Sequence, residues 1–349
     1  MEQIEERESL IIKKFDEDER KAKVLTPLVC MGEIIPWFPA VYFTELQDAI
    51  INDKRLVIVT PTRYEPLVER FPCSWRILIK DHYHLSMIAH RHARLNDDWR
   101  RYPRPENWSE CAQILIRELK PLLGDIAWGM TVGVFMTDIH TYSPALPTLC
   151  GHWAVNHFQT KVNPTNAVNW LAFTPSESVL QSFPYDWGQH QRPFVAIHTH
   201  AGTQDRQKAW PYWNAFLEIM EEEFEGTVFR LGGMDDLEVK LEPQKNFVDL
   251  GWTHNSVAPL ISQMAQMDYF LGAVGGMMYL ALSQRVPTIA FFDQHTREAY
   301  SDSHINYDGT ELMRGWGVFD LDYFLGDNFS DFSPEKIFKK FCALKEKYS

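Results

Sequence analysis

A glycine and a glutamate lie next to each other early in the chain, directly after a predicted strand. The segment 30–41, CMGEIIPWFPAV, places Gly32 next to the carboxylate of Glu33 directly after a predicted strand. Gly32 allows a sharp turn, and a carboxylate held there could take a proton from an acceptor hydroxyl. Glu33 could instead cap the helix that follows. The residues alone leave both interpretations open.

Two later segments could bind an anion. The segment 198–211, HTHAGTQDRQKAWP, leads from a predicted strand through a glycine-containing loop to a predicted helix. Free N–H groups at a helix start, the helix dipole and the Lys208 ammonium together suit a diphosphate. Gly275 and Gly276 lie between another strand and helix, where a ligand could approach the backbone. The alternatives are a plain surface lysine and a tight strand–helix turn.

Buried-strand and helix patterns alternate around these segments. In the first half the sequence predicts strands at 25–30, 55–61 and 75–81, a helix at 41–51 and a peripheral amphipathic helix within 1–23. In the second half it predicts strands at 193–200, 227–233, 246–251, 268–273 and 286–292, alternating with helices at 210–224, 257–267 and 276–284. Such alternation is typical of an α/β fold with doubly wound parallel sheets.

We therefore expect two Rossmann-like domains facing each other across a cleft. The predicted domains are residues 1–185 and 186–330, with a linker around 176–193 that is rich in Ser, Gln and Pro. A further C-terminal helix is expected within 331–349. Open α/β sheets bind ligands at the carboxyl ends of their strands, where the three segments above would lie.

Composition limits the function classes. The 349 residues carry a formal net charge of −13, with 45% hydrophobic and 23% charged residues, as in a globular protein of two domains. No apolar run is long enough to span a bilayer, and the charged N-terminus does not resemble a secretory signal, so a cytoplasmic location is expected. No GxxxxGK[ST], GxGxxG or GxSxG motif is present, which argues against P-loop, dinucleotide-binding and α/β-hydrolase sites.

The sequence predicts neither disulfides nor a bound metal. The five cysteines have no CxxC spacing and are read as reduced thiols: Cys30, Cys73, Cys111, Cys150 and Cys342. The HYH, HRH and HTH pairs have no partner at metal-binding spacing. Asp320-Leu321-Asp322 resembles the metal-binding DxD of some sugar-transfer enzymes, but its late position favours a solvated turn.

One basic stretch stands out in this acidic chain. Residues 80–104 carry Lys80 and five arginines, of which four could contact an acceptor: Arg91, Arg94, Arg100 and Arg101. Aromatic residues such as Trp99 and Tyr102 lie among them, a mixture that would suit a phosphorylated glycan or DNA. A solvated surface with no ligand is the alternative.

Taken together, the motifs resemble those of a known family. Met31-Gly32-Glu33 followed by Pro39-Ala40-Val41 resembles the MGD…PAL opening of the lipopolysaccharide heptosyltransferases, glycosyltransferase family 9. His198…Gly202…Lys208-Ala209-Trp210-Pro211 is similar to the H-x-G…K-x-W-P loop of that family. Residues 275–281 with 287–290 are similar to its [ST]-G-x-x-H-L-A…P-T-I-A segment. The matches come in family order, and residues 85–185 show none.

The resemblance implies the GT-B fold and inverting transfer of a sugar from a nucleotide-sugar, with no cofactor and no obligatory metal. It also implies that residues 1–185 bind the acceptor, that residues 186–330 bind the nucleotide-sugar, and that the helix within 331–349 returns to the N-terminal domain. Glu33 would occupy the place of the catalytic Asp, Lys208 would contact the diphosphate and Asp235 the ribose. The donor contacts that it implies are His198, Gly202, Thr203, Lys208, Gly233, Asp235, Gly275, Gly276, Met277 and Tyr279.

Three positions depart from the family pattern. Val274 stands where the family has Asp, Gly275 where it has Ser or Thr, and Tyr279 where it has His. The family residues face the sugar and phosphates, so the departures leave the sugar open. The leading hypothesis is transfer to a glycan or glycolipid hydroxyl. The alternatives are transfer to hydroxymethylated bases of DNA and a non-catalytic module that binds sugar nucleotides.

Overall fold

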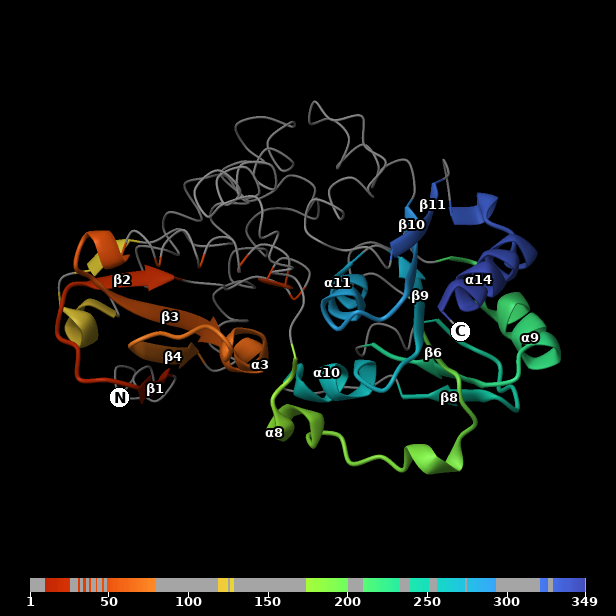
Figure 1. Ribbon diagram of the computed structural model, residues 1–349, viewed down its shortest axis with the longest axis horizontal. Helices are drawn as coiled ribbons and strands as arrows, with labels where there is room; N and C mark the ends of the chain where they lie inside the picture. The colour runs from red at the N-terminus through yellow and green to blue at the C-terminus, as the bar shows by residue number, and fades with distance from the viewer. Residues whose placement is uncertain are drawn as a thin grey trace. The chain divides into compact units, whose positions relative to one another are not determined.

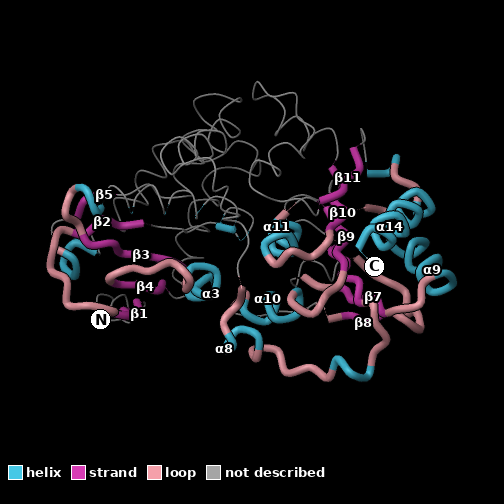
Figure 2. Tube along the Cα trace, in the orientation of Figure 1, coloured by secondary structure: helices cyan, strands magenta, loops and turns pink. Residues whose placement is uncertain are grey.

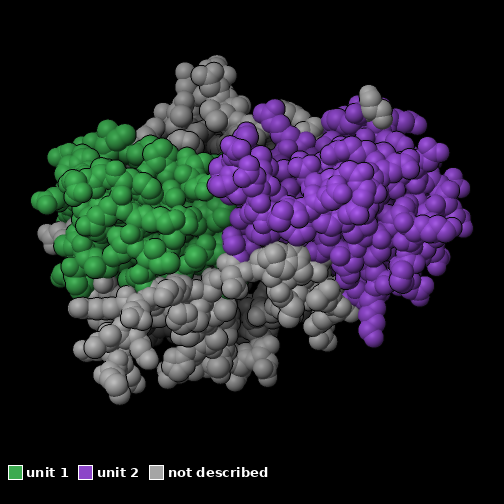
Figure 3. Space-filling view, turned by 90° about the horizontal axis from the view of Figure 1, so that it is seen from below, with its two compact units in different colours: residues 1–167, 302–304 green, residues 168–301, 305–349 purple. Residues whose placement is uncertain are grey.

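The computed structural model divides the chain into two compact units, shown in Figure 3. Unit 1 contains residues 1–167 and 302–304, and unit 2 contains residues 168–301 and 305–349. The structure describes residues 10–25, 31, 34–35, 38, 42, 46, 49–79, 119–124, 126–128, 174–199, 210–232, 239–250, 256–273, 275–292, 321–325 and 329–348.

Unit 1 is built on a five-stranded sheet. Its strands are β1 (Leu10–Lys14), β2 (Ala22–Leu25), β3 (Arg55–Pro61), β4 (Trp75–Ile79) and β5 (Ile126–Trp128), in the order β1-β4-β3-β2-β5. All neighbours are parallel except β1, which pairs antiparallel with β4. The 3-10 turn η1 (Thr62–Tyr64) and the short helix α3 (Glu65–Val68) join β3 to β4. Strands β3 and β4 confirm the sequence-based predictions.

The start of unit 1 differs from those predictions. The expected N-terminal helix is wrong over residues 10–14, which form the edge strand β1, because the adjacent β-branched Ile11 and Ile12 suit an extended chain. The strand predicted at 25–30 lies at 22–25 among the described residues. Helical residues begin at Met31 and recur through Ile51, whereas the sequence predicted a helix only from 41 onward.

Unit 2 is built on a six-stranded sheet in which every pairing is parallel (Figures 1 and 2). Its strands are β6 (Phe194–His198), β7 (Thr227–Arg230), β8 (Phe247–Asp249), β9 (Tyr269–Ala273), β10 (Thr288–Phe292) and β11 (Leu321–Leu325), in the order β11-β10-β9-β6-β7-β8. Five of the six were predicted. The turn expected at Asp320-Leu321-Asp322 is wrong for its last two residues, which pair with β10 in β11.

Helices cover both faces of this sheet. On one face α9 (Trp213–Glu223) and α14 (Pro334–Tyr348) pack over alternate residues of β6 and β9 in one aromatic-rich core. On the other lie α10 (Ala258–Met264) and α11 (Gly276–Ser283) (Figure 1). Shorter pieces are α8 (Glu177–Leu180), η2 (Trp187–Gln189) and η5 (Phe329–Asp331). This three-layer arrangement is the predicted doubly wound α/β architecture.

Residues 168–185 belong to unit 2, so the division lies earlier than the 185/186 boundary expected from the sequence. The physical reason is packing between helices. α8 packs against α10, and the Ser262 hydroxyl donates a 2.6 Å hydrogen bond to the Leu180 carbonyl. The segment predicted as a linker is therefore partly held against unit 2.

The C-terminal helix packs in unit 2, and its predicted return to the N-terminal domain stays a prediction. Within α14, the buried residues Ile337, Phe341 and Leu344 recur every three or four positions along one face of the helix. They join the core of unit 2, where the Phe341 ring lies edge-on to Phe224 and Tyr269, with centroids 5.4 and 5.5 Å apart. This apolar contact with α9 and β9 assigns α14 to unit 2.

Candidate functional site

The carboxyl edge of the unit 2 sheet has one position suited to a ligand. From β6 the chain proceeds to β7 and β8 on one side, and then β9, β10 and β11 continue on the other side of β6. The connections that follow β6 and β9 therefore leave in opposite directions, and doubly wound sheets bind ligands at such a switch point. The segment after β6 contains Lys208, and the segment after β9 contains Gly275 and Gly276.

His198 and Gly272 lie side by side at this switch point. They are directly paired in the β6–β9 register, and His198 is buried. A Cβ at Gly272 would lie 3.1 Å from both the Cβ and the backbone oxygen of His198, and 3.0 Å from the Phe270 ring. Gly272 is therefore needed for the close approach of β6 and β9 at the predicted donor residue His198.

We expect Gly272→Ala to lower the free energy of unfolding by about 1–3 kcal/mol, because the added methyl group presses on backbone that cannot rotate away. Urea unfolding measures the change. A matched control is Gly188→Ala, whose new Cβ would meet only a side-chain oxygen of Asp186, at 3.3 Å. Equal stability of the two variants would contradict this account of Gly272.

The start of α11 follows β9 and lies at the same edge of the sheet as His198. Gly275 is the residue before the helix, has an extended backbone (φ 166°) and makes no side-chain cap. Gly276 begins the helix, whose first N–H groups have no intrahelical acceptor and suit an anion. Because an extended backbone suits any residue, the conformation of Gly275 does not itself demand glycine. Gly275 has no side chain that could cover those N–H groups.

Met277 and Tyr279, also predicted as donor contacts, are buried in the first turn of α11. Tyr279 is 2% exposed. Its backbone N–H donates a 3.1 Å hydrogen bond to the Gly275 carbonyl. Residues 277–283 are all buried, so α11 is surrounded by protein along its length. The structure thus brings His198, Gly275 and Gly276 to one edge and places Met277 and Tyr279 within the adjacent helix.

An ion pair between a buried arginine and an exposed aspartate lies on both sides of the predicted ribose contact in the sequence. Arg230, at the end of β7, pairs through two nitrogens with the Asp249 carboxylate at the end of β8; the Nε–Oδ1 distance is 2.8 Å. Its Nη1 donates to the Val239 carbonyl at 2.7 Å. Gly233 and Asp235 lie between these anchors in sequence and fall outside the described residues.

Unit 1 has a switch point of its own. From β2 the chain proceeds to β3 and β4 on one side, and β5 lies on the other side of β2. The segment that follows β2 leads to Glu33, which lies outside the described residues between the helical Met31 and Ile34. The predicted base therefore follows the strand at which a doubly wound sheet binds its ligand.

Buried aromatic side chains hold the helical residues that follow Glu33. Phe38 and Tyr42 are four residues apart, and both pack against Phe71, with ring centroids 5.1 and 4.8 Å away. The Tyr42 hydroxyl donates to the Pro72 carbonyl at 2.7 Å. Burial, with a smaller contribution from Cys73, raises the pKa of Tyr42 to about 12, so this hydroxyl keeps its proton at neutral pH.

Several predicted site residues lie outside the described residues. They are Glu33, Gly202, Thr203, Lys208, Gly233 and Asp235, together with the arginines Arg91, Arg94, Arg100 and Arg101. Within the described ranges, no three His, Cys, Asp or Glu side chains are grouped as a metal site would need. No helix in the same part of the chain is long and apolar enough to cross a membrane.

Sequence reasoning missed two residues at the switch point. Thr199 follows β6, is 1% exposed, and its buried Oγ1 has no hydrogen-bond partner in the described part of the chain. Gly272 had no motif that would distinguish it from any glycine in a strand. The available signal was the position of both residues at the ends of the two strands that flank the switch point.

Three solved structures of glycosyltransferases are similar to this chain. A family 9 glycosyl transferase from Veillonella parvula matches with a TM-score of 0.55 and 14% identity, over 95% of this chain and 99% of that one. The E. coli ADP-heptose LPS heptosyltransferase II matches with a TM-score of 0.55 and 14% identity, over 92% and 98% of the two chains. The chain has the GT-B fold.

A third GT-B structure, the E. coli heptosyltransferase WaaC with ADP, matches with a TM-score of 0.52 and 12% identity, over 93% and 99% of the two chains. No protein-family model and no curated protein sequence matches the chain. At these identities the likeness establishes the GT-B fold. Function must be argued from the residues at the two switch points.

Proposed function

We propose that this protein is an inverting glycosyltransferase that moves a sugar from a nucleotide-sugar to a hydroxyl of a glycan or glycolipid. The donor would bind at the carboxyl edge of the unit 2 sheet, and unit 1 would bind the acceptor. One observation supports the proposal: the segments that resemble family 9 follow the strands at the topological switch point of each sheet. These strands are β2 in unit 1, and β6 and β9 in unit 2.

The roles follow from the chemistry of an inverting transfer. The acceptor hydroxyl attacks the anomeric carbon while the bond from that carbon to the diphosphate oxygen breaks. Glu33 takes the hydroxyl proton as the new bond forms. Lys208 and the first N–H groups of α11 stabilise the negative charge that develops on the leaving diphosphate.

The donor carries a nucleoside diphosphate, and ADP is the first nucleotide to test. One of the similar proteins is an ADP-heptose heptosyltransferase, and another was solved with ADP. The departures at Val274, Gly275 and Tyr279 lie beside the diphosphate in this proposal, so the sugar is to be identified by experiment. The proposal includes no bound metal. Transfer is therefore expected to persist in EDTA, and loss of transfer on chelation would refute that part.

The test is a thermal-shift screen with nucleoside diphosphates and nucleotide-sugars, ADP and ADP-heptose first. A ligand that binds only the folded protein at 100 times its Kd adds about 2.7 kcal/mol of stability, which raises Tm by several degrees. Release of nucleoside diphosphate with a glycolipid acceptor then tests transfer. No shift with any nucleotide would refute the donor site, whereas binding without turnover would favour a non-catalytic module.

A modified-DNA acceptor would depend on the basic stretch at 80–104, and all of that stretch lies outside the described residues. No described residue favours that acceptor. In the transfer assay, duplex DNA with hydroxymethylated bases serves as the competing acceptor. Preference for it over glycolipid would reverse our choice.

A further inference from the structure

A cavity lies at the amino ends of three neighbouring strands of the unit 2 sheet. Its volume is about 480 Å³, within the range of sites that hold a small molecule. Pro193, Asp268 and Pro287 line it, and they directly precede β6, β9 and β10. The proposed donor site is at the carboxyl ends of the same sheet. The five residues of β9 span about 16 Å, so the two sites are separate.

One wall of the cavity is an ion pair. The Nη1 atom of Arg192 lies 2.6 Å from Oδ1 of Asp268, and its Nη2 donates a 3.2 Å hydrogen bond to the Gln266 carbonyl. The guanidinium also lies over the Phe194 ring, 4.3 Å from the centroid, while the Phe194 N–H donates to Oδ2 of Asp268 at 2.7 Å. Both charged groups are therefore held in place, although the Arg192 side chain is 52% exposed.

This ion pair can make further hydrogen bonds. A guanidinium has five N–H groups, and Arg192 uses two of them within the described part of the chain. A carboxylate oxygen can accept two hydrogen bonds, and these contacts supply one to each oxygen of Asp268. A ligand that donates and accepts at neighbouring atoms can therefore bind both groups without separating them.

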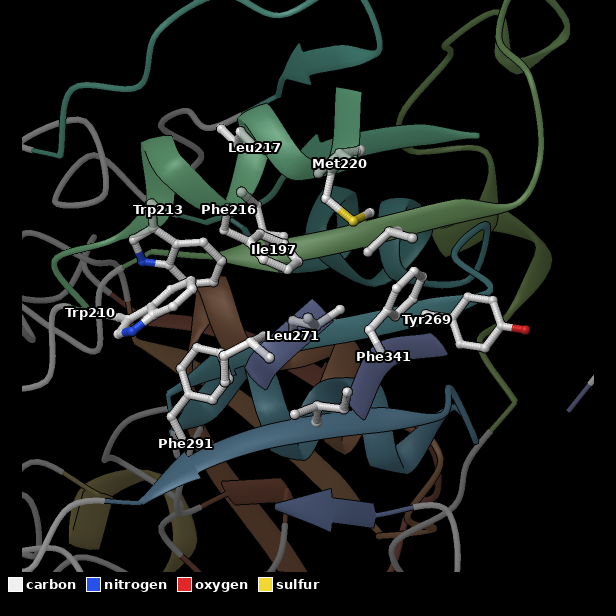
Figure 4. Close-up of a cluster of buried hydrophobic side chains, with 14 of the residues drawn as sticks. Ile197, Trp210, Trp213, Phe216, Leu217, Met220, Tyr269, Leu271, Phe291 and Phe341 are labelled. Carbon is white, nitrogen blue, oxygen red and sulfur yellow. The ribbon is translucent and has the colours of Figure 1, made fainter. Parts of the chain in front are cut away.

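Two tyrosines add aromatic surface to the cavity. Tyr348 is the last residue of α14 and is 36% exposed. Tyr269 is more buried, and Figure 4 shows its hydroxyl directed away from the cluster that contains Phe341. The face of an aromatic ring is weakly negative and attracts positive groups. The Lys347 ammonium lies over the Tyr348 ring, 4.7 Å from its centroid, as such a face favours.

We propose that this cavity binds one ring of a neutral sugar. The charges of Arg192 and Asp268 compensate each other, so the described walls favour neither an anion nor a cation. A purely apolar ligand would remove water from the ion pair without replacing its hydrogen bonds, which costs free energy. A pyranose avoids both costs, because its neighbouring hydroxyls can bind the pair while its C–H face packs on a tyrosine ring. This site does not depend on the proposed donor site.

Saturation-transfer NMR on the whole chain tests the proposal with three probes: methyl β-D-glucopyranoside, methyl β-D-galactopyranoside and methyl α-D-mannopyranoside. We expect at least one to bind with a millimolar Kd, as is usual for so small a ligand. Added salt should not weaken binding, because a neutral ligand has no charge to screen. Saturating ADP should not displace the sugar. Lack of binding by all three probes, or displacement by ADP, would overturn the proposal.

Substitutions locate the bound sugar. Tyr348→Ala should weaken binding at least tenfold, and Tyr348→Phe, which keeps the ring, less than twofold. Arg192→Met keeps the apolar stem but removes the N–H donors, so a tenfold loss is expected there too. The matched control is Tyr212→Ala, which removes a tyrosine of similar exposure, 38%, from the start of α9 and should leave binding unchanged. Equal binding by Tyr348→Ala and Tyr212→Ala would overturn the proposal.

Discussion

Glu33→Gln is expected to lower turnover by about 10²–10⁴-fold while donor affinity stays within a few-fold. A hydroxyl is a poor nucleophile near neutral pH, so a base must take its proton as the bond to the anomeric carbon forms. Glutamine keeps the size of the side chain and most of its hydrogen bonds but cannot accept this proton. Single-turnover transfer measures the chemical step, and ADP titration measures donor affinity.

A matched control for this variant is Glu17→Gln, an exposed acid of unit 1, which should leave turnover unchanged. The acid limb of the pH–rate profile gives a second readout, because protonation of the base lowers the rate of the unsubstituted enzyme. That limb should disappear from the residual activity of Glu33→Gln. If the variant retains near-normal transfer, Glu33 is a cap or turn residue, and the base must be sought among the histidines at 82–92.

The central strands of both sheets could be predicted because they are buried on two faces. Arg55–Pro61 and Phe194–His198 are buried at every position, and such strands appear in sequence as short continuous apolar runs. The edge strand Leu10–Lys14 is exposed at four of its five residues and ends in two lysines, so its charge pattern resembled a surface helix. Edge strands often carry such charges, so they lack the apolar run by which a buried strand is recognised in the sequence.

The site was predictable to the extent that it depends on local sequence. Gly275 and Gly276 follow an apolar run and precede a helix, a pattern that indicates an open strand–helix junction. Thr199 has no glycine motif beside it. Its place follows from the strand before it, because β6 pairs with β9, far away in sequence, from Val195–Tyr269 to His198–Gly272. The cavity at the amino ends of the strands depends equally on tertiary packing, since Arg192 and Asp268 are 76 positions apart.

Lys208→Ala is expected to weaken binding of a nucleoside diphosphate by about 10–150-fold and to leave binding of the nucleoside within twofold. A charge-assisted hydrogen bond to phosphate contributes about 1.5–3 kcal/mol, which corresponds to that range. The nucleoside lacks the phosphates and so lacks this contact. Isothermal titration with ADP and with adenosine measures both affinities.

Two controls make the test of Lys208 specific: a substitution of another lysine, and the dependence of ADP binding on salt concentration. Lys245→Ala removes a lysine of unit 2 whose side chain is 94% exposed, and it should not change ADP affinity. Raising the salt concentration should weaken ADP binding to the unsubstituted protein more than to Lys208→Ala, because screening acts on the charge that the variant lacks. Equal losses for ADP and adenosine would mean that the substitution disturbs the loop as a whole. The diphosphate would then be held mainly by the backbone N–H groups at the start of α11, the other group at the switch point of unit 2 that we propose for anion binding.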